Sequence, residues 1–343
     1  MSTDDASRRT PAKRARVTAW IVTLAISVPV ALLLTWPQAF AAQRAPLIAQ
    51  LIAFRAPLAV ALALIAVIAA AVALRTRGWG IAATLALVLG AAAAANGGIL
   101  LLRGSSTELP EADLTIASWN TQGGATAPSD VARLILEFDA DVVSLPETDE
   151  TASAEIARIL AGEGVRMTPH TTRAQNEEYS WIPTSVLIAE DLGEYRVDTA
   201  AGSTPGLPSA VWRPVDGDGP TIVAAHPLPP LFESMGDWEA GLRWIADVCA
   251  SPDVIVAGDL NATVDHLSGL GIDGALIGGC DDAALAASNG SGGTWPSDIP
   301  TWAASPIDHV LFGSAWTARG TQVVTRFRTG SDHRPIVAVL DAR

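Results

Sequence analysis

The chain has 343 residues, 49% of them hydrophobic, and its 36 acidic and 22 basic residues give a formal net charge of −14 at pH 7. Two cysteines are too few for a disulfide-rich scaffold and lie too far from any histidine for a zinc site. The sequence up to about Arg103 is mostly Ala, Leu, Val and Ile, whereas the rest has the mixed composition of a water-soluble domain.

Three apolar runs without Asp, Glu, Lys or Arg occupy residues 17–36, 57–74 and 79–102. About 20 apolar residues cross a bilayer as a helix, so the runs predict a three-helix membrane anchor over residues 17–103. A cleavable signal peptide is the alternative for the first run, because basic residues precede it and small residues follow it. The run is longer than the ~7–15 residues of a signal-peptide core, and two more runs follow, which favours the anchor.

The basic residues predict how the anchor is oriented. Residues 1–16 contain five Lys and Arg, and the second short loop has Arg75 and Arg77. The first loop has only Arg44 and Arg55. Because cytoplasmic segments are enriched in Lys and Arg, we expect a multi-pass cell-membrane protein with a cytoplasmic basic tail over residues 1–16. Three crossings then place the soluble domain outside the cytoplasm.

Residues 104–113 are polar with Gly and Pro, which is typical of a linker. The remaining residues 114–343 are enough for one large single-core domain. From residue 107 onward, 34 Asp and Glu stand against 12 Arg and no Lys, a net charge of −22. Because Lys and Arg supply most non-specific affinity for nucleic acid, this charge argues against a general DNA-binding domain.

Short runs of β-forming residues end beside polar side chains throughout this domain. They cover residues 114–119, 140–145, 221–225, 254–258, 306–312 and 335–340. Residues 129–138 have helical spacing, with Ser129 as the expected N-cap. Polar groups at strand ends are held rigidly while they face an open rim. The pattern predicts a layered α/β domain.

Six motifs with the polar side chains that metal-dependent phosphoester hydrolysis requires follow one another in this domain. They are Ser118-Trp119-Asn120, Leu145-Pro146-Glu147-Thr148, Ala225-His226-Pro227, Gly258-Asp259-Leu260-Asn261, Ile307-Asp308-His309 and Ser331-Asp332-His333-Arg334-Pro335. In this order they resemble the endonuclease/exonuclease/phosphatase superfamily. The resemblance implies a DNase I-like α/β fold, a two-sheet β-sandwich flanked by helices, here preceded by three transmembrane helices. It also implies a hydrolase of phosphoester or pyrophosphate bonds.

The resemblance identifies Glu147 as the principal metal ligand, with Asn120 helping to position the ion or the phosphate and Asp332 as a second ligand. A carboxylate is a hard oxygen ligand that suits Mg²⁺, which is the expected cofactor, with Mn²⁺ as the alternative. Relatives usually have Gln where this chain has Pro146, and some DNA-repair members have Asp where it has Gln122. A second ion site there is therefore doubtful, and one ion is expected.

The resemblance makes His333 either the general base or a group that stabilises the phosphate in the transition state, with Asp308 as its partner. An imidazole needs such a partner to fix its tautomer and raise its basicity. His309, the next residue after Asp308, is expected to order its strand. The resemblance gives the remaining roles: Asp259 orients the attacking water, Asn261 donates to a phosphoryl oxygen, and His226 hydrogen-bonds the phosphate.

A narrower likeness connects the three-span anchor and the proline-rich run after His226 with actinobacterial membrane proteins of the vancomycin/teicoplanin-resistance J type. It implies that the domain hydrolyses a lipid-linked phosphate or pyrophosphate of the cell envelope, with the bilayer as partner and no obligate protein partner. An extracellular nuclease and a catalytically inactive envelope scaffold are the alternatives. All the expected polar positions are filled, which argues against the scaffold.

Several features of the domain lie outside these motifs. Cys249 and Cys280 are expected to form a disulfide if the domain is extracytoplasmic, and to be buried thiols otherwise. The segment Gly290 to Pro296 is rich in glycine but has neither a Lys nor a following helix pattern, so it is expected to be a loop rather than a phosphate-binding motif. Trp295 and Trp302 are candidates for the substrate rim. In the third apolar run, Asn96-Gly97-Gly98 suggests close helix packing.

Overall fold

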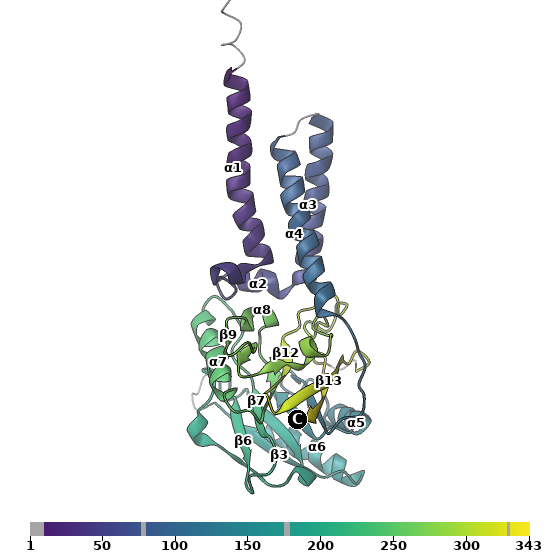
Figure 1. Cartoon of the computed structure of the whole chain (residues 1–343). Helices are drawn as coiled ribbons and strands as arrows, with labels where there is room; N and C mark the ends of the chain where they lie inside the picture. Colours follow the sequence, from purple (N-terminus) through teal and green to yellow (C-terminus); the bar gives the residue numbers. More distant parts are fainter. Residues whose placement is uncertain (1–9, 77–79, 175–178, 328–329) are drawn as a thin grey trace, which may run out of the picture. The chain divides into compact units, whose positions relative to one another are not determined.

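The computed structural model describes residues 10–76, 80–174, 179–327 and 330–343 (Figure 1). Most of the expected basic tail, including Arg8 and Arg9, lies outside them, as do Arg77 and Trp79. The chain separates into two compact units, Met1–Leu100 and Leu101–Arg343. We call them the membrane unit and the catalytic unit.

The membrane unit contains three helices that are long and apolar enough to cross a bilayer. The candidate spans are Val17–Thr35, Arg55–Thr76 and Ile81–Arg103, with mean hydropathies of 2.3, 2.8 and 2.1. They belong to helices α1 (Thr10–Thr35), α3 (Arg55–Thr76) and α4 (Ile81–Arg103), and a short helix α2 (Ile48–Ala53) precedes α3. The three predicted membrane helices are confirmed by length and composition.

An apolar cluster and one polar pair hold these helices together. Ala31, Leu62 and Ala92 are buried where α1, α3 and α4 meet. Asn96 is buried, and its amide is satisfied because it accepts a hydrogen bond from the Arg55 guanidinium and donates to the carbonyl oxygen of Ala92 at 2.9 Å. The close packing expected at the glycines after Asn96 is absent, since a Cβ on either would meet nothing within 4 Å. The polar pair, not the glycines, marks the contact.

Two six-stranded sheets form the centre of the catalytic unit, in the strand orders β13-β14-β1-β2-β4-β3 and β11-β12-β8-β7-β6-β5, beside a small sheet of β9 and β10. The strands are β1 (Leu114–Ser118), β2 (Val142–Pro146), β3 (Met167–Thr172), β4 (Thr184–Ala189), β5 (Tyr195–Val197), β6 (Ala210–Pro214), β7 (Thr221–Ala225), β8 (Val254–Asp259), β9 (Leu270–Gly271), β10 (Ile277–Gly278), β11 (Asp281–Asp282), β12 (Asp308–Phe312), β13 (Trp316–Val323) and β14 (Ile336–Ala342).

Alternation along the strands builds the two layers of the core. Ile116 of β1 packs in one cluster with Ile222 of β7 and Ile255 of β8, which lie in the other sheet. Ala117, the next residue of β1, belongs to a second cluster that includes Leu134 of α5. Successive side chains of a strand point to opposite faces, so β1 serves both the interior of the sandwich and the helix layer. The predicted two-sheet sandwich flanked by helices is therefore confirmed.

Helices lie on the outer faces of the sandwich, with α5 and α6 on one side and α7 on the other (Figure 1). The helices of this unit are α5 (Pro128–Phe138), α6 (Glu150–Gly162), α7 (Met235–Val248), α8 (Val264–Leu267) and α9 (Ala283–Ala286), and Ala283 of α9 is buried in the cluster between the two sheets. The predicted N-cap of α5 was wrong. Pro128 occupies the first turn and Ala127 is the capping residue, because the fixed φ of proline suits a position whose N–H has no partner in the helix.

Two connections close this unit. The first residues of the expected linker are bound to the domain: Ser106 N donates to Ser288 O at 2.8 Å, and Ser291 N donates to Gly104 O at 3.1 Å. Gly104 has a φ of 71°, and a Cβ there would collide with the Ser288 carbonyl. The second connection is a disulfide between Cys249, which follows α7, and Cys280, which precedes β11, with 5.4 Å between their Cα atoms.

Candidate active site

The sheet topology brings the motif residues to one region. Strand β1 runs parallel to β2, and β7 runs parallel to β8, so within each pair the carboxyl ends lie at the same edge. Asn120 and Glu147 follow the first pair, while His226 and Asp259 lie at the ends of the second. Asp308 begins β12 and pairs in register with Asp259. All of these side chains except Glu147 are buried.

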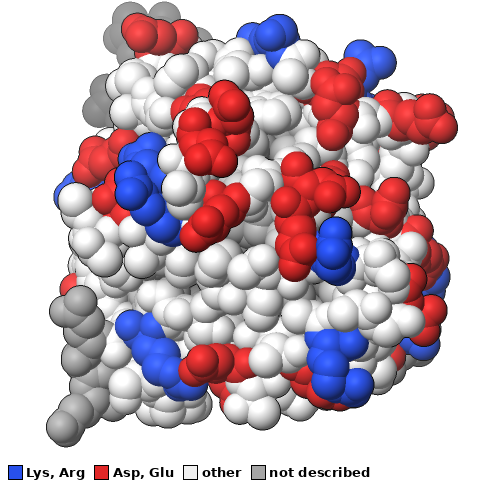
Figure 2. All heavy atoms as spheres, turned by 90° about the horizontal axis from the view of Figure 1, so that it is seen from below, with Lys and Arg blue, Asp and Glu red and all other residues white. Residues whose placement is uncertain are grey.

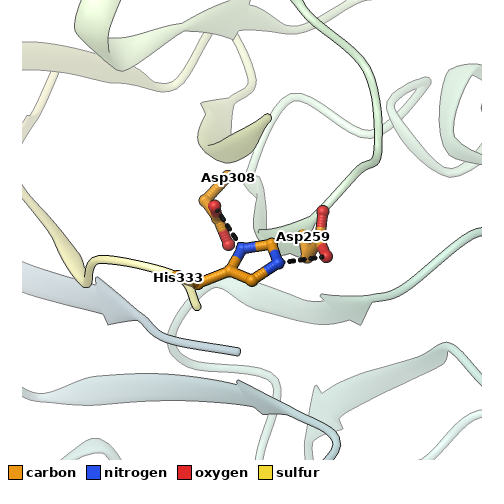
Figure 3. A group of neighbouring side chains, drawn as sticks. All are labelled: Asp259, Asp308 and His333. Atoms are coloured by element: carbon orange, nitrogen blue, oxygen red, sulfur yellow. Dashed lines mark hydrogen bonds and ion pairs between the residues drawn. The ribbon is translucent and has the colours of Figure 1, made fainter. Parts of the chain in front are cut away.

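A hydrogen-bonded histidine forms the buried side of the site (Figure 3). The Nδ1 atom of His333 lies 2.9 Å from Asp308 Oδ2, and Nε2 lies 3.6 Å from Asp259 Oδ2. The ring therefore bridges carboxylates that come from two neighbouring strands. The structure brings together the pair His333 and Asp308 that the sequence suggested.

Electrostatics fix the charge of this ring. Burial alone would lower the pKa of His333, but Asp308 and Asp259 outweigh it and raise the pKa to about 10. Burial also raises the pKa of Asp259, against the opposing effect of the imidazolium. In the metal-free protein His333 is thus protonated at neutral pH. This state suits donation to a phosphoryl oxygen better than abstraction of a proton.

His226 is the opposite case. Its Nε2 atom lies 3.9 Å from Asp259 Oδ2 and 4.0 Å from Glu147 Oε1, so it faces the same carboxylates. Complete burial lowers its pKa to about 4, and the charge of His333 contributes to the decrease. His226 is therefore neutral at pH 7 and can offer either a donor or an acceptor to a bound phosphate.

Glu147 and Asn120 form the open side of the site. The Glu147 side chain is 28% exposed. The Nδ2 atom of Asn120 lies 3.1 Å from both Glu147 Oε1 and Asp259 Oδ2, while Oδ1 accepts from the backbone N–H of Gln122 at 2.9 Å. The amide thus presents its NH₂ group to the two carboxylates. In this arrangement Asn120 positions Glu147, and its oxygen is turned away from the site.

The backbone is strained where these side chains leave their strands. Glu147, Asn261 and Gln122 have φ values of 60°, 49° and 52°, a left-handed region that non-glycine residues seldom adopt. Such strain persists only where surrounding contacts enforce it, and it is concentrated at functional sites. Gly258 serves the same region differently, because a Cβ there would collide with the carbonyl oxygen of Ala225 on β7. Close approach of the two strands thereby sets the position of the next residue, Asp259.

Asn261 and Asp332 lie at the edges of the centre. The Asn261 N–H donates to Asp259 Oδ1 at 2.9 Å, and its Nδ2 donates to Pro227 O at 3.0 Å, so one amide hydrogen remains for a substrate. Asp332 is 42% exposed, and its Oδ1 lies 4.0 Å from His333 Nε2. Its other oxygen accepts from the indole N–H of Trp295 at 2.9 Å. Asp332 is thus placed at the rim.

Several supporting residues were missed by sequence reasoning. The Gln122 side chain, which replaces an acidic residue of some relatives, accepts from the backbone N–H of Asp332 at 3.0 Å. The indole N–H of Trp119 donates to His333 O at 3.1 Å, and Ser331 Oγ donates to Asn120 O at 2.6 Å. Each connects two segments that lie far apart in the sequence. Trp119 and Ser331 lie inside motifs, which was the only signal for them, and Gln122 was noted only as a departure from relatives.

Arg334 binds the loop that precedes β12 to the site. Its buried guanidinium donates to the carbonyl oxygens of Gly293, Pro296, Ser297 and Ile299. This loop includes the Gly-rich segment and carries Trp295 to Asp332. The segment is therefore an ordered wall of the site, and no P-loop geometry is present among its described residues.

His309 has both ring nitrogens engaged away from the centre. Its Nδ1 lies 2.7 Å from Asp282 Oδ2, and its Nε2 lies 2.8 Å from Ala262 O. Burial opposes protonation of this ring, but Asp282 prevails and raises its pKa. These contacts tie β12 to the β11 edge and to the segment after β8. His309 therefore holds its strand in place, as its sequence context suggested.

The donor set on the open side fits a hard divalent cation. Glu147 and Asp259 bind the same amide nitrogen, so two negative charges converge where a cation would balance them. Asp259, Asp308 and His333 also offer ligand atoms within 4.8 Å of one another. This trio fits Mg²⁺ less well, because Nδ1 of His333 is already hydrogen-bonded to Asp308 and Mg²⁺ prefers oxygen ligands.

Sequence comparison identifies the family. The profile of the Endonuclease/Exonuclease/phosphatase family matches residues 117–333, well over half of the chain. The chain belongs to this family. The matched span contains every motif residue of the site, from Asn120 to His333, and the hydrolases of this family act on phosphoesters. No protein of curated function is significantly similar in sequence to this chain.

Solved structures with a similar fold have distant sequences. An endonuclease/exonuclease/phosphatase from Beutenbergia cavernae is 18% identical, with a TM-score of 0.48 over 68% of this chain and 72% of its own. TDP2 from D. rerio, in complex with a single strand DNA product, is 18% identical, with a TM-score of 0.49 over 66% and 98%. A mannosyl-6-phosphatase from Bacteroides thetaiotaomicron is 14% identical, with a TM-score of 0.45 over 66% and 99%. Nothing about the substrate follows from these structures.

Proposed function

We propose that the protein is a membrane-anchored, Mg²⁺-dependent hydrolase that cleaves a lipid-linked phosphate or pyrophosphate outside the cytoplasm. One observation carries the proposal. The chain has three apolar helices of membrane length, and its catalytic unit brings four titratable side chains to one site: Glu147, Asp259, His226 and His333. Asn120 hydrogen-bonds Glu147, and Asp308 hydrogen-bonds His333.

The residues divide the chemistry between them. Glu147 would hold the cation, steadied by Asn120, and the cation would supply counter-charge to the phosphoryl oxygens. Asp259, which Asn261 N–H steadies, accepts a hydrogen bond from the attacking water and orients it. His226 binds a phosphoryl oxygen. These assignments follow from which atoms face the shared space and which are already engaged elsewhere.

His333 has the most constrained role. Its protonated ring is held by Asp308 at Nδ1 and directs Nε2 toward Asp259, so it can donate to a phosphoryl oxygen that becomes more negative in the transition state. We therefore favour the stabilising role over the general-base role. Proton transfer to the leaving oxygen by the same Nε2 is compatible with this geometry.

Charge and attachment support a lipid substrate. Acidic side chains gather in groups over one face of the catalytic unit (Figure 2), and the net charge of residues 107–343 is −22. This field repels soluble polyanions such as DNA. A site attached to membrane helices samples bilayer lipids at high effective concentration. The extracellular nuclease is therefore the less favoured alternative.

The extracytoplasmic location is supported by the basic residues of the tail and second loop and by the disulfide between Cys249 and Cys280, a bond typical of oxidising compartments. A tag placed after Arg343 tests it. We expect protease added to intact cells to remove the tag, while a tag placed before residue 10 stays protected. The reverse pattern would place the active site in the cytoplasm.

Turnover of a substrate panel tests the activity. We expect the protein in lipid nanodiscs with Mg²⁺ to hydrolyse a polyprenyl phosphate or pyrophosphate with kcat/KM at least about tenfold above that for double-stranded DNA, at ~0.15 M salt where screening leaves an ~8 Å reach. Equal or better turnover of DNA would promote the nuclease alternative. An absence of turnover with every phosphoester would favour the inactive scaffold.

A further inference from the structure

A hollow adjoins the side of the site formed by Glu147. It has a volume of about 90 Å³, and its wall includes Glu147, Thr121, Pro128, Ala152, Trp181 and Pro183. Glu147 belongs to both this hollow and the catalytic centre. A phosphate bound at the cation would therefore have the hollow as its neighbour. None of the roles assigned above uses this space.

Five polar side chains line the hollow, Thr121, Thr126, Glu147, Thr148 and Asp149, and each already takes part in at least one interaction. The hydroxyl groups of Thr121 and Thr148 bond each other at 2.7 Å, and Thr121 Oγ1 also bonds the carbonyl oxygen of Glu147. The Asp149 carboxylate accepts from Ala152 N at 2.7 Å, as the N-cap of α6. Among the described residues, no Lys, Arg or His lines the hollow. It therefore has no cation for a second phosphate.

Apolar surface remains for a ligand. The indole of Trp181 is 73% exposed, although it borders the hollow, and the wall also includes Val131 and Ile156 together with the prolines named above. Exposed indole beside prolines loses contact with water when an uncharged apolar group covers it. The protein has three helices of membrane length, and in a membrane the abundant molecules that join an apolar chain to a phosphate are lipids.

We propose that this hollow is the subsite for the first carbons of a hydrocarbon chain attached to the scissile phosphate, with Trp181 as its specificity-determining wall. The proposal rests on the proposed function and deepens it from a phosphoester in general to an alkyl or prenyl phosphate. The cation at Glu147 would bind the phosphate headgroup, and the hollow would bind the first carbons of the attached hydrocarbon chain. A sugar or nucleoside phosphate would use the hollow poorly, because the wall hydroxyls are already engaged.

Binding of monoalkyl phosphates tests the subsite without requiring turnover. The full chain in lipid nanodiscs with Mg²⁺ is titrated calorimetrically with ethyl, butyl, hexyl and octyl phosphate, each below its micelle concentration. We expect the affinity of the native protein to rise up to about fourfold for each methylene group that enters the hollow. Trp181→Ala should weaken octyl phosphate at least about tenfold and change ethyl phosphate by less than about twofold.

Two further variants complete the design. Ala152→Leu fills the hollow from helix α6 and should flatten the chain-length dependence in the same way, with ethyl phosphate as the internal check of folding. Ile272→Ala is the control, because Ile272 is an apolar residue that is 56% exposed but lies outside the wall, and it should behave like the native protein. The control also accounts for partition of octyl phosphate into the nanodisc lipid.

The results separate the two proposals. A native protein without chain-length preference, or one whose preference survives both Trp181→Ala and Ala152→Leu, overturns the subsite even if lipid phosphate is hydrolysed. A preference for ribose phosphate over butyl phosphate that Trp181→Ala removes would assign the hollow to a sugar instead, and would also overturn it. If the chain-length preference depends on Trp181 but no lipid phosphate is turned over, the subsite stands and the proposed function fails.

Discussion

The two sides of the active site differ in how their charges are controlled. On the buried side, the Asp308 side chain is fully buried and His333 is fixed between two carboxylates. On the open side, Glu147 and Asp332 are 28% and 42% exposed, and solvent reaches them. Burial therefore sets protonation on one side, whereas the other side is arranged to receive an ion and a substrate.

The two buried histidines, His226 and His333, also differ in how their charge is controlled. Both lose solvent, yet the pKa of His226 falls to about 4 while the pKa of His333 rises to about 10. The difference lies in the Nδ1 atom. Asp308 binds that of His333, whereas that of His226 has no hydrogen-bond partner among the described residues. The hydrogen bond to Asp308, together with the charge of Asp259, keeps the His333 ring charged at neutral pH, whereas burial prevails at His226.

Removal of the charged ring should have the largest effect. His333→Ala is expected to lower kcat by ~10²–10⁴-fold, because groups that donate or accept a proton at the reacting oxygen contribute on that scale. The measurement is the steady-state rate on the best substrate of the panel, with thermal unfolding as the check of folding. A variant that keeps more than about a tenth of the native rate would remove His333 from the chemistry.

The open side should respond through the metal. Glu147→Gln keeps the shape of the side chain but removes its charge, so we expect at least about tenfold more Mg²⁺ at half-maximal rate, and a kcat lower by two or more orders of magnitude. Glu150→Gln, three residues away in the first turn of α6, is the control and should match the native protein. Identical Mg²⁺ curves for both variants would place the cation elsewhere. Chelation of Mg²⁺ should abolish turnover.

Features set by local sequence patterns could be predicted, whereas features set by contacts between distant segments could not. The strands and apolar spans were predictable because alternation and long apolar runs are local patterns, and β7 (Thr221–Ala225) matches its predicted range. The site residues were found through short motifs at strand ends. Their convergence depends on the parallel pairs of β1 with β2 and β7 with β8, which no local pattern specifies.

The supporting contacts could not be predicted for the same reason. Arg334 was visible in its motif, but its four carbonyl acceptors belong to a loop some forty residues earlier, whose path has no periodic signal. The pairing of Asn96 with Arg55 was missed because it joins two helices across the membrane unit. In each case the partner is fixed by tertiary packing.

The neutral histidine should determine how stability depends on acid. The pKa of His226 is about 4 in the folded protein and about 6.5 when it is unfolded, so only the unfolded chain takes up this proton between those values. Stability is then lost as pH falls from 6.5, by roughly 2 kcal/mol at pH 5. His333 has the opposite sign: its contribution is lost as pH rises from about 6.5 toward 10, and it adds little slope below about pH 6, where the ring is mostly protonated in both states.

Thermal unfolding of metal-free protein, followed by tryptophan fluorescence from pH 6 to pH 5, measures this dependence. His226→Asn should remove most of the acid slope while His309→Asn keeps it, since the pKa of His309 is raised and its proton is not released in this range. Equal slopes for the native protein and His226→Asn would mean that water or an ion solvates the ring of His226.

The smallest effect is expected at the rim, where one neutral side chain supports the open side. Gln122 Oε1 accepts from the Asp332 N–H, and a single neutral hydrogen bond contributes about 1 kcal/mol, so Gln122→Ala should lower kcat/KM about fivefold. The Mg²⁺ dependence should stay unchanged and non-cooperative, because one ion at Glu147 does not involve this amide. Gln122→Glu is the informative companion: a carboxylate there would face the backbone N–H of Asp332 and retain that bond. If it made the Mg²⁺ curve cooperative, the rim would need only one added charge to hold a second ion, and the native glutamine would be what keeps the site to one.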